Sequence, residues 1–316
     1  MRYTRREVGR LTLGALAAAG LTGLEARRGA PAQGSRSRIN GVRIGAITYS
    51  FRSMSNVDDI IRAMADIGLG EVELMSNHAE AAAGAPSGRA AGAGRGAGNT
   101  PEAQAAREAL REWRRSISRD TFRPVRQKFE AAGIGVSLLC YNMSANISDE
   151  DIEYGFLMAE SLGVRAISTS TLVSVARRVA PFADRHRILV GFHNHSNLTD
   201  PNEVATPESF DAVMSFSKYH GVNLDIGHFT ASNFDAVAYL DNHHARITNL
   251  HLKDRGRDQG ANVSWGAGAT PIREVLRLLR QKKYDILANI EFEYRGDDVV
   301  GEVRKCFEYC KAALQS

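Results

Sequence analysis

Four apolar segments in the second half of the chain each end in side chains that can bind a metal ion or move a proton. The segments end at residues 191–195 (GFHNH), 224–228 (LDIGH), 250–254 (LHLKD) and 289–293 (NIEFE). Histidine nitrogens and carboxylate oxygens together suit a divalent ion such as Mn, Co, Zn, Fe or Mg. Because four segments in succession carry such residues, they favour one shared metal site over isolated structural histidines.

The ligands that we expect are His193, Asp225, His251 and Glu291. Alternate side chains of a strand share a face, so His193 and His195 point the same way and either imidazole can be the ligand. Glu293 is the alternative to Glu291. We expect Glu293 outside the ligand set because it lies farther from the interior of its strand.

A metal held in this way suits proton abstraction beside a carbonyl group. Coordination of the carbonyl and a neighbouring hydroxyl would stabilise an enediolate and lower the pKa of the carbon acid. Glu291 is the candidate base, while His195 or His228 could return a proton or protonate a leaving hydroxyl. Lys253 could neutralise the negative charge that develops on the substrate.

Three further residues are candidates for substrate contacts. Glu73 ends an earlier apolar run and is expected to bind a substrate hydroxyl or to orient a ligand, with a structural ion pair as the alternative. Arg255 and Arg257 follow the third segment and could hold a carboxylate or phosphate. Solvated loop arginines are the alternative for this pair.

The elements that must position these residues alternate regularly along the chain. Beyond Ile39, apolar runs of strand length alternate with amphipathic stretches of helix length, which is typical of βα units. We predict eight strands, at residues 43–51, 71–75, 135–142, 166–171, 189–195, 222–228, 247–254 and 287–294. Eight right-handed units close most simply into an α/β fold of the (β/α)8 TIM-barrel type, and an open doubly wound sheet is the alternative.

Cap signals mark several helix boundaries. Apolar periodicity predicts helices at residues 57–67 and 271–281, and a longer helix is expected at 101–118. Helix starts are expected at Ser148, Thr206 and Thr270. Glycines that can adopt a left-handed conformation are expected to end helices at positions 68, 133 and 163.

The first 32 residues form a separate segment. Arg5 and Arg6 precede a mostly apolar stretch at 11–24 and a small-residue site at 30–32, which predicts an export signal similar to a twin-arginine signal. A surface helix is the alternative. The stretch is shorter than the roughly 20 residues of a spanning helix, and no cysteine follows it, so we expect a periplasmic or secreted protein without a stable membrane anchor.

The remaining residues, 33–316, are expected to form one barrel domain with one insert. Residues 79–99 consist almost entirely of Ala, Gly, Pro, Ser and Arg, and predict a mobile loop insert after the second strand. The glycine-rich run within this insert lacks the preceding strand of a dinucleotide-binding loop.

Composition excludes some classes of protein. The chain has 316 residues, of which 43% are hydrophobic and 24% are charged, proportions typical of a globular protein. Its formal charge of +4 belongs to residues 1–32, which leaves 34 basic and 34 acidic side chains in the remainder. A basic net charge would favour a nucleic-acid partner, and the balanced charge of the remainder gives no such indication. Three cysteines are too few and too poorly spaced for a disulfide framework or a zinc cluster.

From about Ile39 to the C-terminus, the chain resembles the xylose isomerase-like TIM-barrel superfamily of sugar phosphate isomerases and epimerases. The motifs that carry the resemblance lie at residues 191–195, 224–228, 251–254, 265–268 (WGAG) and 290–293.

The resemblance implies that Asp225, His251 and Glu291 bind one divalent metal and that His228 contacts the substrate. His193 stands where the epimerases have a glutamate that works as one of two paired acid and base groups. This departure puts a two-base epimerization in doubt and is closer to the inosose dehydratase-like branch.

The sequence therefore predicts an exported, metal-dependent isomerase or epimerase of a small sugar or keto-sugar. The alternatives are a dehydratase that uses the same enolization on an inosose-like substrate, and a non-catalytic, metal-containing carbohydrate-binding barrel. A DNA repair nuclease of the same superfamily is disfavoured by the balanced charge. The resemblance also allows a homo-oligomer, because dimers and tetramers are common in that superfamily.

Overall fold

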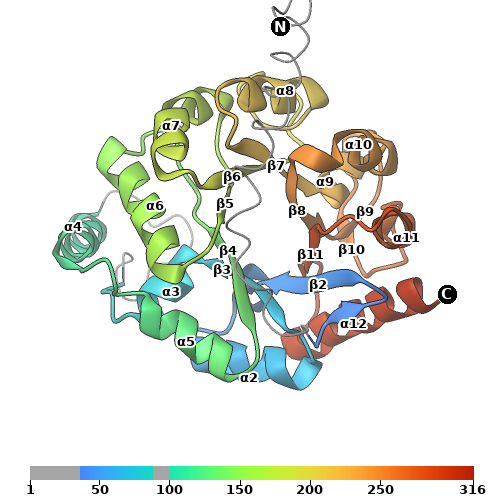
Figure 1. The fold of residues 1–316 in the computed structure, drawn as a ribbon, viewed down its shortest axis with the longest axis horizontal. Helices are drawn as coiled ribbons and strands as arrows, with labels where there is room; N and C mark the ends of the chain where they lie inside the picture. The colour runs from blue at the N-terminus through green and yellow to red at the C-terminus, as the bar shows by residue number, and fades with distance from the viewer. Residues whose placement is uncertain (1–35, 88–99) are drawn as a thin grey trace, which may run out of the picture. The chain divides into compact units, whose positions relative to one another are not determined.

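The computed structural model describes residues 36–87 and 100–316, which form a closed barrel of eight parallel strands (Figure 1). In barrel order the strands are β2 (Val42–Ile47), β3 (Glu71–Met75), β4 (Gly135–Cys140), β5 (Ala166–Thr169), β6 (Leu189–His193), β7 (His220–Asp225), β8 (Ile247–Leu252) and β11 (Leu287–Ile290). Strand β11 pairs with both β8 and β2, so the sheet has no open end. The predicted (β/α)8 barrel is confirmed, and the open doubly wound sheet is wrong.

Helices surround the barrel and cover its apolar outer face (Figure 1). They are α2 (Val57–Ile67), α3 (Ser76–Ala82), α4 (Pro101–Ser116), α5 (Arg123–Ala131), α6 (Asp149–Leu162), α7 (Val173–His186), α8 (Pro207–Ser215), α9 (Ile226–Ala231), α10 (Ala236–His243), α11 (Ile272–Lys282) and α12 (Val299–Gln315). Two short 3-10 helices are η1 (Thr48–Phe51) and η2 (His244–Arg246), and three short strands are β1 (Arg38–Ile39), β9 (Asp254–Arg255) and β10 (Asn262–Val263).

Several strands end earlier than the apolar pattern predicts. Strand β2 ends at Ile47 and continues directly as η1, and strand β7 ends at Asp225, where α9 begins. The apolar pattern runs on because residues of these turns, such as Phe51 and Phe229, are still buried. As a consequence, His228 lies on a short helix above the barrel and not on a strand.

Most predicted helix ends are confirmed. Ser148 and Thr206 each accept a backbone N–H in the first turn of their helix. Positive φ angles are found at Gly68 (96°), Gly133 (74°) and Gly163 (65°). Thr270 is the exception, because α11 begins after Pro271 and the Thr270 hydroxyl instead accepts the backbone N–H of Arg255.

The predicted insert at 79–99 is corrected at its start. Residues up to Ala82 belong to helix α3, in which Ala79 and Glu80 are buried. Glu80 accepts hydrogen bonds from Arg114 of α4 (2.8 Å) and from the Tyr154 hydroxyl (2.9 Å). These contacts pack α3 against α4 and α6, which composition alone does not show. Residues 88–99 lie outside the described residues.

The predicted export signal also lies outside the described residues, which begin at position 36. Across 36–87 and 100–316, every helix is too short or too polar to cross a membrane.

Candidate metal centre

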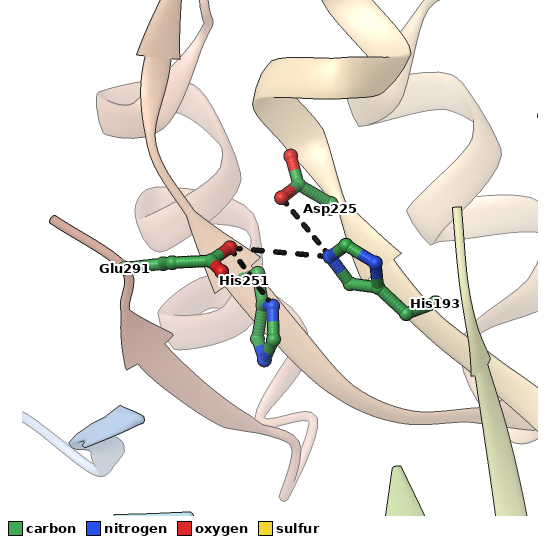
Figure 2. Close-up of side chains that lie close together, drawn as sticks. All are labelled: His193, Asp225, His251 and Glu291. Atoms are coloured by element: carbon green, nitrogen blue, oxygen red, sulfur yellow. Dashed lines mark hydrogen bonds and ion pairs between the residues drawn. The ribbon is translucent and has the colours of Figure 1, made fainter. Parts of the chain in front are cut away.

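The four expected ligands meet at the carboxyl end of the barrel (Figure 2). His193 and Asp225 are the last residues of β6 and β7, His251 lies near the end of β8, and Glu291 directly follows β11. Asp225 is in register with His251, which brings neighbouring strand ends to one level. One ligand atom from each side chain lies within 4.8 Å of the others, and all four residues are buried.

The ligand atoms face one another, and their contacts leave one buried nitrogen, His251 Nδ1, without a hydrogen-bond partner among the described residues. His193 Nε2 lies 3.3 Å from Asp225 Oδ2 and 3.9 Å from Glu291 Oε2. His251 Nδ1 lies 3.0 Å from Glu291 Oε2 but has no hydrogen-bond partner within the described residues, and Glu291 Oε2 also lies 2.9 Å from Lys253 Nζ. Buried polar atoms left unpaired are costly. Two imidazole nitrogens and two carboxylate oxygens therefore fit a divalent metal ion, which would pair with His251 Nδ1.

The two neighbouring histidines have separate positions. The strand ends at His193, so period-two alternation no longer applies at His195. His195 has 43% of its side chain exposed, and its Nδ1 lies 3.8 Å from Glu203 Oε2. Burial and the nearby His193 lower the pKa of His195 to about 4. His193 thus belongs to the ligand group, the set formed by His193, Asp225, His251 and Glu291. His195 lies beside this group, on the wall of a cavity.

Lys253 places a buried cation against the ligand group. Its Nζ lies 2.9 Å from Glu291 Oε2, 3.1 Å from Asp225 Oδ2 and 2.5 Å from Glu293 Oε2. Burial opposes the charge of Lys253, but the carboxylates outweigh it and raise its pKa. Burial likewise opposes the charges of Asp225 and Glu291, whose pKa values Lys253 helps to hold low. The ammonium is thus a fixed positive charge beside the ligands.

His228 lies between two cationic side chains at the cavity. Arg255 Nη1 lies 2.7 Å from its Nδ1. Lys253 Nζ lies 3.2 Å from the other ring nitrogen, Nε2, so both nitrogens of His228 face side chains that can only donate. Burial and the charge of Lys253 lower the pKa of His228 well below its usual value. His228 is therefore a neutral imidazole, and it lines the cavity.

The structure places the three predicted substrate contacts elsewhere. Arg255 donates to the Gly260 carbonyl and to Ser196 as well as to His228, so it holds loops together. Arg257 is exposed on the loop after β9. Glu73 is fully buried, with both carboxylate oxygens bonded to barrel side chains. Among the described residues, the cavity wall includes none of these three.

A cavity of about 240 Å³ lies over the ligand group. Part of its wall comes from the ends of early strands, which sequence reasoning missed, and includes Ile47, Tyr49, Met75, Asn142, Thr169 and Ser170. Short polar residues after a strand look like ordinary loop composition. The only signal in the sequence was that they directly follow predicted strands. The metal side of the cavity is charged, and this opposite side is neutral.

The WGAG motif forms a loop around one carboxylate. Asp254 accepts the backbone N–H groups of Gly266 (2.7 Å), Gly268 (3.0 Å) and Thr270 (3.1 Å). A Cβ atom at Gly268 would collide with the Asp254 carboxylate. The motif therefore supports the chain directly after Lys253.

Replacing that carboxylate is expected to be costly for stability. Asp254→Ala should lower the free energy of unfolding by about 3 kcal/mol, because it strands several N–H groups without an acceptor. Denaturant unfolding of the variant measures this loss. Asp297→Ala, at an exposed position, is the control and should change it by less than about 0.5 kcal/mol. Equal stability of the two variants would contradict the role of Asp254.

Comparison with known proteins agrees with this geometry. Residues 165–311 match the family model described as a xylose isomerase-like TIM barrel. No curated protein matches the chain. The resemblance expected from the motifs is thus confirmed over the segment that carries all four expected ligands.

Solved structures share the barrel at low sequence identity. They include a protein described as the "probable 3-DHS dehydratase AsbF" from Bacillus anthracis, with 15% identity over 87% of this chain and 98% of that chain and a TM-score of 0.57. An L-ribulose 3-epimerase has 12% identity over 87% and 95%, with a TM-score of 0.61. The IOLI protein, solved with a zinc atom, has 15% identity over 87% and 94%, with a TM-score of 0.56. At these identities the likeness shows the fold.

Proposed function

We propose that this chain, which matches the xylose isomerase-like TIM-barrel family model over residues 165–311, is a divalent-metal-dependent isomerase or epimerase of a small sugar or keto-sugar. The observation that carries the proposal is the buried ligand group, in which His251 Nδ1 faces Glu291 Oε2 and has no hydrogen-bond partner among the described residues. The solved neighbours, which include an epimerase and a protein with zinc, support it.

The proposed reaction begins with removal of a proton beside a carbonyl. A bound divalent ion would supply Lewis-acid polarisation of that carbonyl and of a neighbouring hydroxyl. Glu291 borders the cavity and takes the proton. The Lys253 ammonium stabilises negative charge as it develops on substrate oxygens. The neutral imidazole of His228 lines the cavity beside this ammonium.

A second candidate is loss of water from the same type of substrate. The carboxylates Glu291 and Glu293 both follow β11 and both contact Lys253, so they lie on one side of the cavity. The side formed by the end of β6 instead carries imidazoles, His193 and His195. An imidazole on this side could deliver a proton to a leaving hydroxyl. The dehydratase-named neighbour supports this candidate.

The cavity favours a small carbohydrate. Its volume of about 240 Å³ is below the roughly 300–1,000 Å³ typical of sites for drug-sized ligands. The neutral side of the cavity carries amide and hydroxyl groups, which suit sugar hydroxyls. One unphosphorylated monosaccharide or sugar acid is the proposed substrate.

Hydrogen exchange tests the proposal. The purified protein, loaded in turn with Mn, Co or Zn, is incubated in deuterated water with a panel of keto-sugars and sugar acids, and proton NMR follows loss of carbon-bound hydrogen. Exchange with at least one substrate is expected, and the product spectrum separates rearrangement from loss of water. Tight binding without exchange would instead identify a carbohydrate-binding barrel.

We also propose export through residues 1–32, supported by the adjacent Arg5 and Arg6 ahead of an apolar stretch. A folded reporter fused behind residues 1–40 is expected to cross the bacterial inner membrane. Replacement of Arg5 and Arg6 by lysine should retain the reporter in the cytoplasm. Export that survives this replacement would point to a different route.

A further inference from the structure

A second carboxylate lies beneath the ligand group, inside the barrel. Glu73 of β3 is fully buried, and every polar group bonded to it is a donor. The Ser168 hydroxyl donates to Oε1, while Asn249 Nδ2 (3.0 Å) and Asn289 Nδ2 (2.6 Å) donate to Oε2. His251 Nε2 lies 2.9 Å from the same Oε2. Glu73 is thus a buried carboxylate whose two oxygens both accept hydrogen bonds, and it directly contacts one expected metal ligand, His251.

This contact settles which nitrogen of His251 faces the ligand group. A carboxylate can only accept, so a contact of 2.9 Å places the imidazole proton on Nε2. The amide nitrogen of Asn223 lies farther from Nε2, at 3.2 Å, and is itself a donor. A histidine binds a metal as a neutral ring, so with the proton on Nε2 the lone pair lies on Nδ1, the atom 3.0 Å from Glu291 Oε2.

The barrel interior is shaped to hold this carboxylate. Gly45 of β2 lies against Asn289, and a Cβ atom there would be only 2.5 Å from Asn289 Oδ1. The missing side chain leaves room for the amide that donates to Glu73. Asn249 is held in turn by Thr248, whose hydroxyl donates to its Oδ1 (2.8 Å). The side chains that donate to Glu73 are thus held in place by the residues around them.

The other imidazole ligand has a different partner. His193 Nδ1 lies 3.3 Å from the Ser170 hydroxyl, a neutral group at the cavity. A carboxylate behind a ligating histidine fixes its ring orientation and makes it a stronger donor, and such partners typically change metal affinity by about 10- to 100-fold. Of the two histidines in the ligand group, only His251 thus has a carboxylate behind its ring.

We propose that Glu73 is the positioning residue of the metal centre, which holds His251 with Nδ1 toward the ion and strengthens it as a ligand. This inference rests on the proposed function, because it requires a metal in the ligand group. It removes Glu73 from contact with the substrate and makes a strand outside the four ligand-bearing strands part of the centre.

Metal affinity of Glu73→Gln tests the proposal, with Ser168→Ala as the matched control. The Ser168 hydroxyl donates to the other oxygen of Glu73 and does not contact His251. Removing this hydroxyl therefore disturbs the hydrogen bonds of Glu73 without removing its carboxylate. Competition with a chromogenic chelator measures the Kd for Zn²⁺ and Co²⁺. We expect Glu73→Gln to weaken binding by about 10- to 100-fold and Ser168→Ala by less than about threefold.

The visible spectrum of the Co²⁺ forms separates positioning from a purely structural role. Altered ligand geometry should change the absorption bands of Glu73→Gln, while Ser168→Ala should keep the wild-type bands. A purely structural role would lower the stability of the metal-free variant and leave its Kd and spectrum unchanged, which would overturn the proposal. Failure of the wild-type protein to bind metal would instead overturn the proposed function.

A measurement on the wild-type protein covers the case in which Glu73→Gln does not fold. In the metal-loaded protein labelled with ¹⁵N-histidine, NMR should show His251 with a proton on Nε2 and the metal on Nδ1. A proton on Nδ1, with the metal on Nε2, would overturn the role of Glu73.

Discussion

Glu291→Gln is expected to reduce hydrogen exchange between substrate and solvent by about 10³-fold or more. A positioned general base alone contributes roughly 10²- to 10⁴-fold, and the amide cannot accept the proton. The amide oxygen can still reach the metal position, so the variant should retain part of its metal affinity. Exchange rates at saturating metal, compared with the metal Kd, separate loss of the base from loss of the ligand.

Glu293→Gln is the matched control for this experiment. Glu293 lies two residues away, lines the same cavity and contacts the same ammonium, but it is outside the ligand group. We expect it to lose no more than about tenfold in exchange rate, equivalent to about 1.4 kcal/mol. A larger loss for Glu293→Gln than for Glu291→Gln would assign the base to Glu293.

Lys253→Met is expected to have opposite effects on stability and on metal binding. In the metal-free protein, it leaves three carboxylates without their cation, which should lower the free energy of unfolding by about 3–5 kcal/mol. The ammonium lies against Asp225 Oδ2 and Glu291 Oε2, which are also the metal-ligand oxygens. Its removal should therefore tighten the metal Kd by about tenfold, and added metal should restore most of the lost stability.

Thermal unfolding with and without Zn²⁺, together with chelator competition, measures both effects. Lys305→Met is the control, because Lys305 is exposed and pairs with one carboxylate, Glu302. This variant should leave the metal Kd unchanged. If Lys253→Met bound metal more weakly than the wild-type protein, the ammonium would be a support of the centre and not a competitor for its oxygens.

The fold could be predicted because its signals are local. Alternating apolar runs, the caps at Ser148 and Thr206 and the glycines that end helices depend on residues a few positions apart. Closure then follows from eight equal units. Strand ends were predicted less well, since burial continues in η1 and α9 after the ladder hydrogen bonds have stopped. The packing of α3 was missed because its partners lie on α4 and α6.

The composition of the candidate metal centre follows from the chain alone, since residues at the ends of neighbouring parallel strands must meet at one rim. The choice between His193 and His195, the attachment of Arg255 and the partner of Glu73 do not. Glu73 is 176, 178 and 216 positions from Asn249, His251 and Asn289. Contacts of that kind arise when the barrel closes and brings opposite strands together across its axis. The spacing of residues along the chain does not indicate such contacts, so these roles can be assigned only from the tertiary structure.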